Sequence, residues 1–174
     1  FQIINPAWLD SAAVNWFIPN PEWYNQDRKL LNSIDLILCR TREVERIFND
    51  LSKRTYYIGF TSRDCLNTSF EKDYTQCLHV AGGSRHKGTQ AIVKAWSGRP
   101  YLNSLTFVIH YSLKHGAQSN IQWINERLSE ADLRIFQNCC GIHLCPSETE
   151  GFGHYLMEAM STGAVVVTTD GPPM

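Results

Sequence analysis

Short apolar runs alternate with amphipathic stretches along the whole chain, and this pattern predicts strands that alternate with helices. Three histidines, His79, His110 and His143, fall inside apolar runs, so we expect them to be core residues. A parallel α/β fold is the arrangement that such an alternation favours. The expected strands cover residues 14–18, 35–39, 55–60, 77–81, 105–111, 121–124, 141–145 and 164–168.

Helices are expected after four of these strands, because apolar residues there recur at three- and four-residue spacing. The first covers residues 42–51, with Thr41 as its N-cap. The second covers about 87–96, and the third opens at Ser129, where a capping-box spacing occurs. The fourth runs from His154 to about residue 161 and stops before Gly163.

A polar segment without periodicity, residues 61–76, separates two series of strands and helices. It predicts a linker between two α/β domains, one over residues 1–70 and one over 71–174. The second series breaks off at Pro172-Pro173-Met174, where another helix would normally follow. We therefore expect two Rossmann-like parallel units, both incomplete, in a piece of a longer protein.

Composition and charge argue against several classes of protein, among them nucleic-acid-binding, membrane-spanning and zinc-binding proteins. The 174 residues are 43% hydrophobic, as in a globular core, and the net charge of -1 gives no electrostatic reason to expect nucleic acid. No apolar run is long enough for a transmembrane segment. None of the six cysteines lies in a CxxC pair, which argues against a zinc site and favours reduced thiols. We expect a cytoplasmic protein.

The most informative segment is residues 146–170, in which a strand, a glycine-bearing turn and a helix follow one another. Helix N-termini bind phosphate, and Gly151 and Gly153 allow the backbone to approach an anion closely. Glu150 and Glu158 bracket the turn and lie roughly 8–12 Å apart at helical rise. Paired acid/base carboxyls on one bond are separated by about 5–9.5 Å. The two glutamates therefore suit groups at opposite ends of a diphosphate.

The segment EGFGHYLMEAMSTGAVVVTTD, which begins at Glu150, resembles the Glu-x7-Glu segment of retaining GT-B glycosyltransferases of the family 4 group. The resemblance implies that Glu150 is the catalytic-side glutamate beside the donor sugar. It implies that Glu158 binds the nucleotide ribose hydroxyls. The turn Gly151-Phe152-Gly153 would give N–H groups to the donor diphosphate, and His154 would contact phosphate or sugar.

A second segment, HVAGGSRHKGTQAIVKAW from His79 to Trp96, resembles the opening strand, loop and helix of the same family's C-terminal domain. Lys87 followed by Gly88 matches the family's diphosphate-binding lysine and glycine. The family's arginine three to five residues earlier is missing, and Arg85 is the candidate that supplies its charge from a shifted position. Residues 1–70 resemble the tail of the acceptor-side N-terminal domain with its hinge, and 71–174 the nucleotide-sugar-binding domain.

The resemblance implies retaining transfer of a sugar from a nucleotide-diphosphate sugar to an acceptor such as a glycan or a lipid-linked sugar, in polysaccharide biosynthesis. No cofactor and no metal are expected, and peripheral membrane association would use sequence outside this chain. We expect the piece alone to be inactive. The alternatives are a nucleotide-sugar-binding module without activity and a GT-B nucleotide-sugar epimerase. A nicotinamide-dependent enzyme is disfavoured, since no GxGxxG follows a strand.

Overall fold

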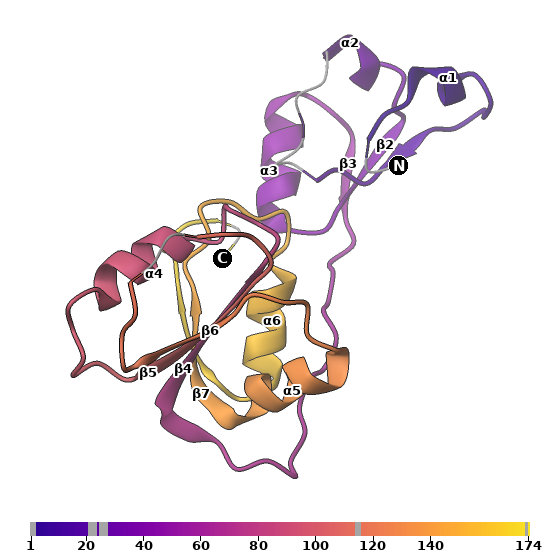
Figure 1. Ribbon diagram of the computed structural model, residues 1–174. Coiled ribbons are helices and arrows are strands. Elements are labelled where there is room, and N and C mark those ends of the chain that lie inside the picture. Colours follow the sequence, from indigo (N-terminus) through magenta and orange to yellow (C-terminus); the bar gives the residue numbers. More distant parts are fainter. Residues whose placement is uncertain (1–2, 21–23, 25–27, 114–115, 173) are drawn as a thin grey trace. The chain divides into compact units, whose positions relative to one another are not determined.

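The computed structural model describes residues 3–20, 24, 28–113, 116–172 and 174. The chain forms two compact units (Figure 1). The first contains the described residues of 1–61 together with 150–152 and 171–172, and the second contains those of 62–149 and 153–170 with Met174. That these units are an acceptor-side and a donor-side domain stays a prediction.

The first unit is built on three parallel strands with β2 in the middle. β1 and β3 are shorter than the sequence predicts. Gly59, which has φ +66°, follows β3 and turns the backbone out of the extended conformation. Two single-turn helices carry too little periodicity to be predicted. The elements are α1 (Pro6–Leu9), β1 (Trp16–Phe17), α2 (Arg28–Leu31), β2 (Leu36–Cys39), α3 (Arg42–Asp50) and β3 (Thr55–Tyr57).

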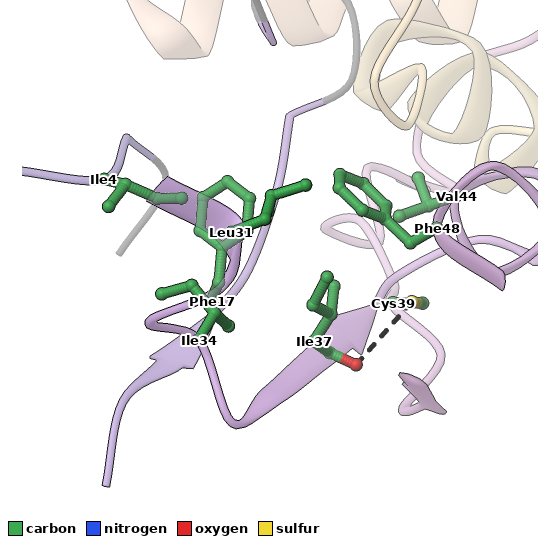
Figure 2. Close-up of a cluster of buried hydrophobic side chains, with 8 residues drawn as sticks. All are labelled: Ile4, Phe17, Leu31, Ile34, Ile37, Cys39, Val44 and Phe48. Carbon is green, nitrogen blue, oxygen red and sulfur yellow. Dashed lines mark hydrogen bonds between the residues drawn. The ribbon is translucent and has the colours of Figure 1, made fainter. Parts of the chain in front are cut away.

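The core of the first unit is one cluster of eight buried side chains (Figure 2). Helix α3 contributes Val44 and Phe48, and the predicted N-cap is confirmed, since the Thr41 hydroxyl accepts a hydrogen bond from the Val44 backbone N–H at 3.2 Å. The Phe48 ring meets the Phe17 ring edge-on, with centroids 6.1 Å apart. The cluster consists of Ile4, Phe17, Leu31, Ile34, Ile37, Cys39, Val44 and Phe48.

The second unit is a five-stranded, fully parallel sheet in the order β6-β5-β4-β7-β8. The α/β fold with parallel sheets predicted from the sequence is therefore confirmed. None of the helices that the structure describes is long and apolar enough to cross a membrane. The elements are β4 (Asp73–Gly82), α4 (Thr89–Trp96), β5 (Ser104–Ile109), β6 (Ile121–Ile124), α5 (Glu130–Cys139), β7 (Cys140–Cys145), α6 (His154–Ser161) and β8 (Val165–Thr168).

Helices cover both faces of this sheet, with α4 on one face and α5 and α6 on the other (Figure 1). Successive side chains of a strand point to opposite faces. Accordingly Cys77 of β4 packs in one cluster with Ile92 of α4, and Leu78 packs in another with Phe136 of α5. From Cys77 on, β4 is therefore covered on both faces, whereas residues 74–76 are exposed.

The structure corrects three local predictions. β4 begins at Asp73, four residues before the expected start, because its first residues pair with β5 and β7 although they are polar. α4 begins at Thr89 because Gly88, with φ +70°, is not helical, so Lys87 lies in the loop. β5 ends at Ile109, and the prediction of a core position for His110 is wrong because the residue lies beyond the strand and is exposed. His79 and His143 are buried, as predicted.

Candidate functional site

The loops after β4 and β7 lie side by side at the carboxyl edge of the sheet. The Glu148 backbone N–H donates a hydrogen bond to the His86 carbonyl oxygen at 2.9 Å. Gly88 lies so close to the second loop that a Cβ there would overlap the Pro146 carbonyl oxygen. The chain leaves β4 toward β5 and later returns to β7 on the other side, so these loops flank the topological switch point. Ligands of open α/β sheets bind in this crevice.

Helices α3 and α5 differ from α4 and α6 in the residue that caps their N-termini. In α3 and α5 the caps Thr41 and Ser129 accept a hydrogen bond from the backbone N–H three residues on. In α4 and α6 the caps are Gly88 and Gly153, both left-handed, with φ +70° and +84°, and neither helix has a side-chain cap. A glycine cap leaves the first-turn N–H groups to other partners, and with the helix dipole they favour an anion. Both such helices follow the loops at the switch point.

Lys87 lies at the start of α6. Its Nζ is 3.8 Å from the centroid of the Tyr155 ring, and Tyr155 is the second residue of that helix. The Tyr155 hydroxyl forms a 2.5 Å hydrogen bond with the Ser147 hydroxyl, and Ser147 is fully buried just after β7. The structure thus brings the predicted lysine to the helix that Gly153 opens.

Arg85 takes a different direction. Its Cζ lies 5.2 Å from the centroid of the Tyr111 ring, and Tyr111 follows β5. The two cationic side chains of the loop therefore point in different directions, Arg85 toward the end of β5 and Lys87 toward α6. The structure does not bring Arg85 onto the ring that holds Lys87.

A buried chain of hydrogen bonds anchors the β4–α4 loop. The Tyr111 hydroxyl donates to the Thr89 hydroxyl at 2.8 Å, and Thr89 is 2.9 Å from Nε2 of His79. Nδ1 of His79 donates to the Leu144 carbonyl at 2.8 Å. Burial lowers the pKa of His79 to about 4, and the charge of Lys87 adds to the lowering. The imidazole is therefore neutral near pH 7 and serves as a fixed link between β4, α4 and β7.

Glu158 lines a cavity of about 330 Å³ beside α5 and α6. Its carboxylate accepts a hydrogen bond from Nε2 of Gln137 at 3.2 Å. Val80, Val108, Leu128 and Leu133 form an apolar wall, and Arg63, Arg127, Glu130 and Arg134 supply charged groups. The cavity therefore combines an apolar surface with a carboxylate that can accept further hydrogen bonds.

Charges around this cavity are arranged in a small network. Glu130 forms ion pairs with Arg134, at 3.3 Å, and with Arg63. Burial raises the pKa of the Cys65 thiol, and the Glu158 carboxylate raises it further, so this thiol stays protonated near pH 7. Cys65 belongs to the cavity lining but offers no nucleophile.

The segment predicted as a linker is fixed to the second unit by hydrogen bonds. The Ser62 hydroxyl lies 3.1 Å from Nδ1 of His154, and the Cys65 backbone N–H donates to the Ser161 hydroxyl at 2.9 Å. Asn138 of α5 donates to the Cys65 carbonyl at 2.9 Å. Residues 62–67 therefore run along α5 and α6, and His154 faces this segment.

Three residues of the predicted site, Glu150, Gly151 and Phe152, group with the first unit. Lys87, Gly153 and Glu158 belong to the second unit. The roles of all six residues stay predictions. Within the described parts of the chain, no group of three or more His, Cys, Asp or Glu side chains could hold a metal ion. Chemistry without a metal also stays a prediction.

Sequence reasoning missed the residues that support the predicted ones. Tyr155 carries a usable signal, because an aromatic residue in the first turn after a glycine cap can hold a cation from a neighbouring loop. Gln137 and Arg127 carry none, because they share a cavity with Glu158 only when α5 and α6 pack on the same sheet face.

The family model of the glycosyl transferases group 1 matches residues 67–174. This match covers more than half of the chain and includes Lys87, Gly153 and Glu158. A comparison with curated proteins gives no match.

Solved structures with the same fold include several transferases and synthases of sugar chemistry. A pneumococcal O-GlcNAc transferase, GtfA, in complex with UDP and GlcNAc, is 18% identical, with a TM-score of 0.58, and the match covers 87% of this chain and 33% of GtfA. A trehalose-6-phosphate protein from E. coli bound with UDP-2-fluoro glucose is 13% identical, with a TM-score of 0.69, and the match covers 89% of this chain and 53% of that protein. Sucrose-phosphate synthase from Thermosynechococcus elongatus is 14% identical, with a TM-score of 0.66, and the match covers 89% of this chain and 50% of the synthase. The chain thus spans between a third and about half of these proteins.

Proposed function

Since the chain belongs to the group 1 glycosyl transferases, we propose that it takes part in transfer of a sugar from a nucleoside diphosphate sugar to an acceptor hydroxyl. The observation that carries the proposal is the pair of glycine-capped helices that start at the switch point, with Lys87 at one of them. The solved transferase and trehalose-6-phosphate structures named above carry UDP or a UDP-sugar, which supports a nucleotide donor.

The donor diphosphate is assigned to the N-terminus of α6. Gly153 leaves first-turn N–H groups without a side-chain cap, and Lys87 adds a full positive charge there. When the bond between sugar and diphosphate breaks, negative charge builds up on the leaving oxygen, and such groups stabilise it. Arg85, directed toward β5, is assigned to the same anion at longer range, and Gly151, Phe152 and His154 are assigned to the turn around it.

The nucleoside is assigned to the cavity that Glu158 lines. Glu158 lies one helical turn after Tyr155, about 4.5 Å along the helix axis, so it would meet a group one step beyond the diphosphate. A carboxylate can accept both ribose hydroxyls, and hydrogen bonds to a charged acceptor are the stronger kind. The apolar wall of the cavity suits the face of a base.

The sugar is assigned to Glu150. In the reaction, the acceptor oxygen forms a bond to the anomeric carbon and loses its proton, while the bond from that carbon to the diphosphate oxygen breaks and the nucleoside diphosphate leaves. We propose retention of configuration and no metal ion, with protein cations and helix ends supplying the positive charge. Polysaccharide biosynthesis is the proposed setting, and the acceptor is a glycan or a lipid-linked sugar.

Two other functions use the same site. A binding module would hold the nucleotide sugar through Lys87 and Glu158 without transfer. An epimerase of the same architecture would rearrange the donor itself. The first is distinguished by donor binding without release of nucleoside diphosphate, and the second by a changed sugar without any acceptor.

The proposal is tested by titrating UDP, GDP and ADP into the purified protein and its Glu158 variants. Glu158→Ala should weaken binding of the preferred nucleoside diphosphate by roughly 10- to 100-fold, because two charge-assisted hydrogen bonds are lost. Glu158→Gln should retain part of the affinity, since its amide oxygen still accepts.

Variants of the second loop supply the control. Glu150→Ala should abolish sugar transfer by the full-length protein and leave free nucleoside diphosphate binding unchanged. Glu148→Ala removes another carboxylate of the same loop, one that is exposed and lies 3.5 Å from Nδ1 of His86, and should alter neither property. Unchanged binding in Glu158→Ala, or loss of binding in Glu150→Ala, would contradict the assigned roles.

A further inference from the structure

Lys87 is held by an aromatic ring at the place where the proposed diphosphate would bind. The ammonium lies 3.8 Å from the centroid of the Tyr155 ring, and Tyr155 stands in the first turn of α6. The ring is itself fixed, because its hydroxyl bonds to buried Ser147 and the Ser147 carbonyl accepts a hydrogen bond from the Thr169 hydroxyl at 2.7 Å. Tyr155 therefore links the lysine of one loop to the end of β7 and to β8.

A ring can position an ammonium without adding charge to the site, because it attracts a cation through its quadrupole and carries no net charge. The contact also gives the ammonium a defined place, because a four-carbon side chain would otherwise lose rotamer freedom when the anion binds.

We propose that Tyr155 is a positioning residue that holds Lys87 ready for the donor diphosphate, an inference that rests on the proposed function. Tyr155 acts through Lys87, so its effect is confined to ligands that carry the diphosphate. A residue that only supported the packing of α6 would affect the nucleoside equally.

The experiment is a double-mutant cycle read by calorimetric titration. The probes are UDP, GDP or ADP, whichever binds the parent protein, and the matching nucleoside. Tyr155→Leu should weaken nucleoside diphosphate binding by about 3- to 10-fold, the range of a cation–π contact, and leave nucleoside binding within about twofold. Tyr155→Phe keeps the ring but loses its bond to Ser147, so it should weaken nucleoside diphosphate binding less than Tyr155→Leu does and leave nucleoside binding within about twofold. In a Lys87→Met background, Tyr155→Leu should cause no further loss.

A matched control lies in the first unit. Arg42 places its Cζ 3.8 Å from the centroid of the Tyr57 ring, the same distance as in the proposed pair. Tyr57→Leu removes that contact and should leave both affinities unchanged. A second readout does not depend on the leucine variant: NMR of labelled lysine should show an upfield-shifted Lys87 ε-methylene in the parent and in Tyr155→Phe.

The outcomes separate the two proposals. Equal losses for nucleoside and nucleoside diphosphate, additive losses in the cycle, or an unshifted Lys87 signal would overturn the positioning role. A parent that binds its nucleotide normally, with Tyr155→Leu unchanged, would overturn only this inference. A parent that binds none of the three nucleotides would overturn the proposed function itself.

Discussion

The two units of the chain use the same parallel architecture at different levels of completeness. In the part that the structure describes, the first has three strands, the shortest of only two residues, and a single buried cluster. The second has five strands with buried clusters on both sheet faces. Within the described residues, only the second unit has strands on both sides of a switch point, and there the glycine-capped helices start. The candidate site therefore depends on a sheet that continues in both directions from β4.

The units differ also in titratable groups. All six histidines of the sequence follow residue 78, so the first unit contains none. Two of them, His79 and His143, are buried in β4 and β7 of the second unit. The comparison between the units can therefore be tested by pH as well as by substitution.

The largest expected effect is selective loss of stability of the second unit in acid. Burial lowers the pKa of His79 and of His143 from 6.5 to about 4. Between these values the unfolded chain binds protons that the folded chain does not, so the free energy of unfolding falls as the pH falls from 6.5 toward 4. Below pH 4 this contribution levels off. The two residues together account for a loss on the order of 7 kcal/mol.

Hydrogen exchange at several pH values, corrected for intrinsic exchange rates, measures the pH dependence of stability for each unit separately. Protection of the second unit should decrease in this window more steeply than protection of the first. His79→Gln and His143→Gln, if folded, should make the pH dependence shallower. An equal decrease in both units would contradict the assignment to buried histidines.

A smaller effect, about 4 kcal/mol, is expected from removing one buried ring in either unit. Phe48 and Phe107 are both fully buried, Phe48 against Phe17 and Phe107 stacked on Trp123 with centroids 4.1 Å apart. Phe48→Ala should abolish exchange protection in the first unit, because its single cluster has little stability to lose. Phe107→Ala should lower the denaturant midpoint of the second unit and leave it folded. Survival of the first unit in Phe48→Ala would show that its core is more stable than its size indicates.

The alternation of strands and helices could be predicted because each apolar run is local in sequence. α6 has the predicted bounds, and both caps, Thr41 and Ser129, form as predicted. The polar start of β4 could not be predicted, because its pairing with β5 and β7 is decided by residues far along the chain. For the same reason His110, placed by its neighbours inside an apolar run, proves to be an exposed residue of a loop.

The parts of the candidate site that lie in one continuous motif could be predicted. The contacts between residues that are distant in the sequence could not. The segment from Gly153 to Glu158 is local, and its glycine cap and helix are those that the sequence indicates. The contact between Lys87 and Tyr155 joins the loop after β4 to α6 through the order of the strands. The cavity around Glu158 needs the packing of α5 and α6 on one face. Such convergence follows from tertiary structure, and local periodicity contains no information about it.

The smallest expected effect, about 3 kcal/mol, tests whether the switch-point loops must lie in contact. Gly88→Ala places a methyl group against the Pro146 carbonyl and forces a residue with φ +70° to carry a Cβ. Gly98 has nearly the same backbone angle, φ +69°, with nothing within 4 Å of its Cβ position. Gly98→Ala should therefore lower the free energy of unfolding by only about 1 kcal/mol, the strain of a left-handed alanine. The difference between the two variants, measured by urea denaturation, isolates the overlap with Pro146 from backbone strain. Equal losses in both variants would mean that the loop after β4 can move away from the loop after β7, and the close contact on which the candidate site rests would then be dispensable.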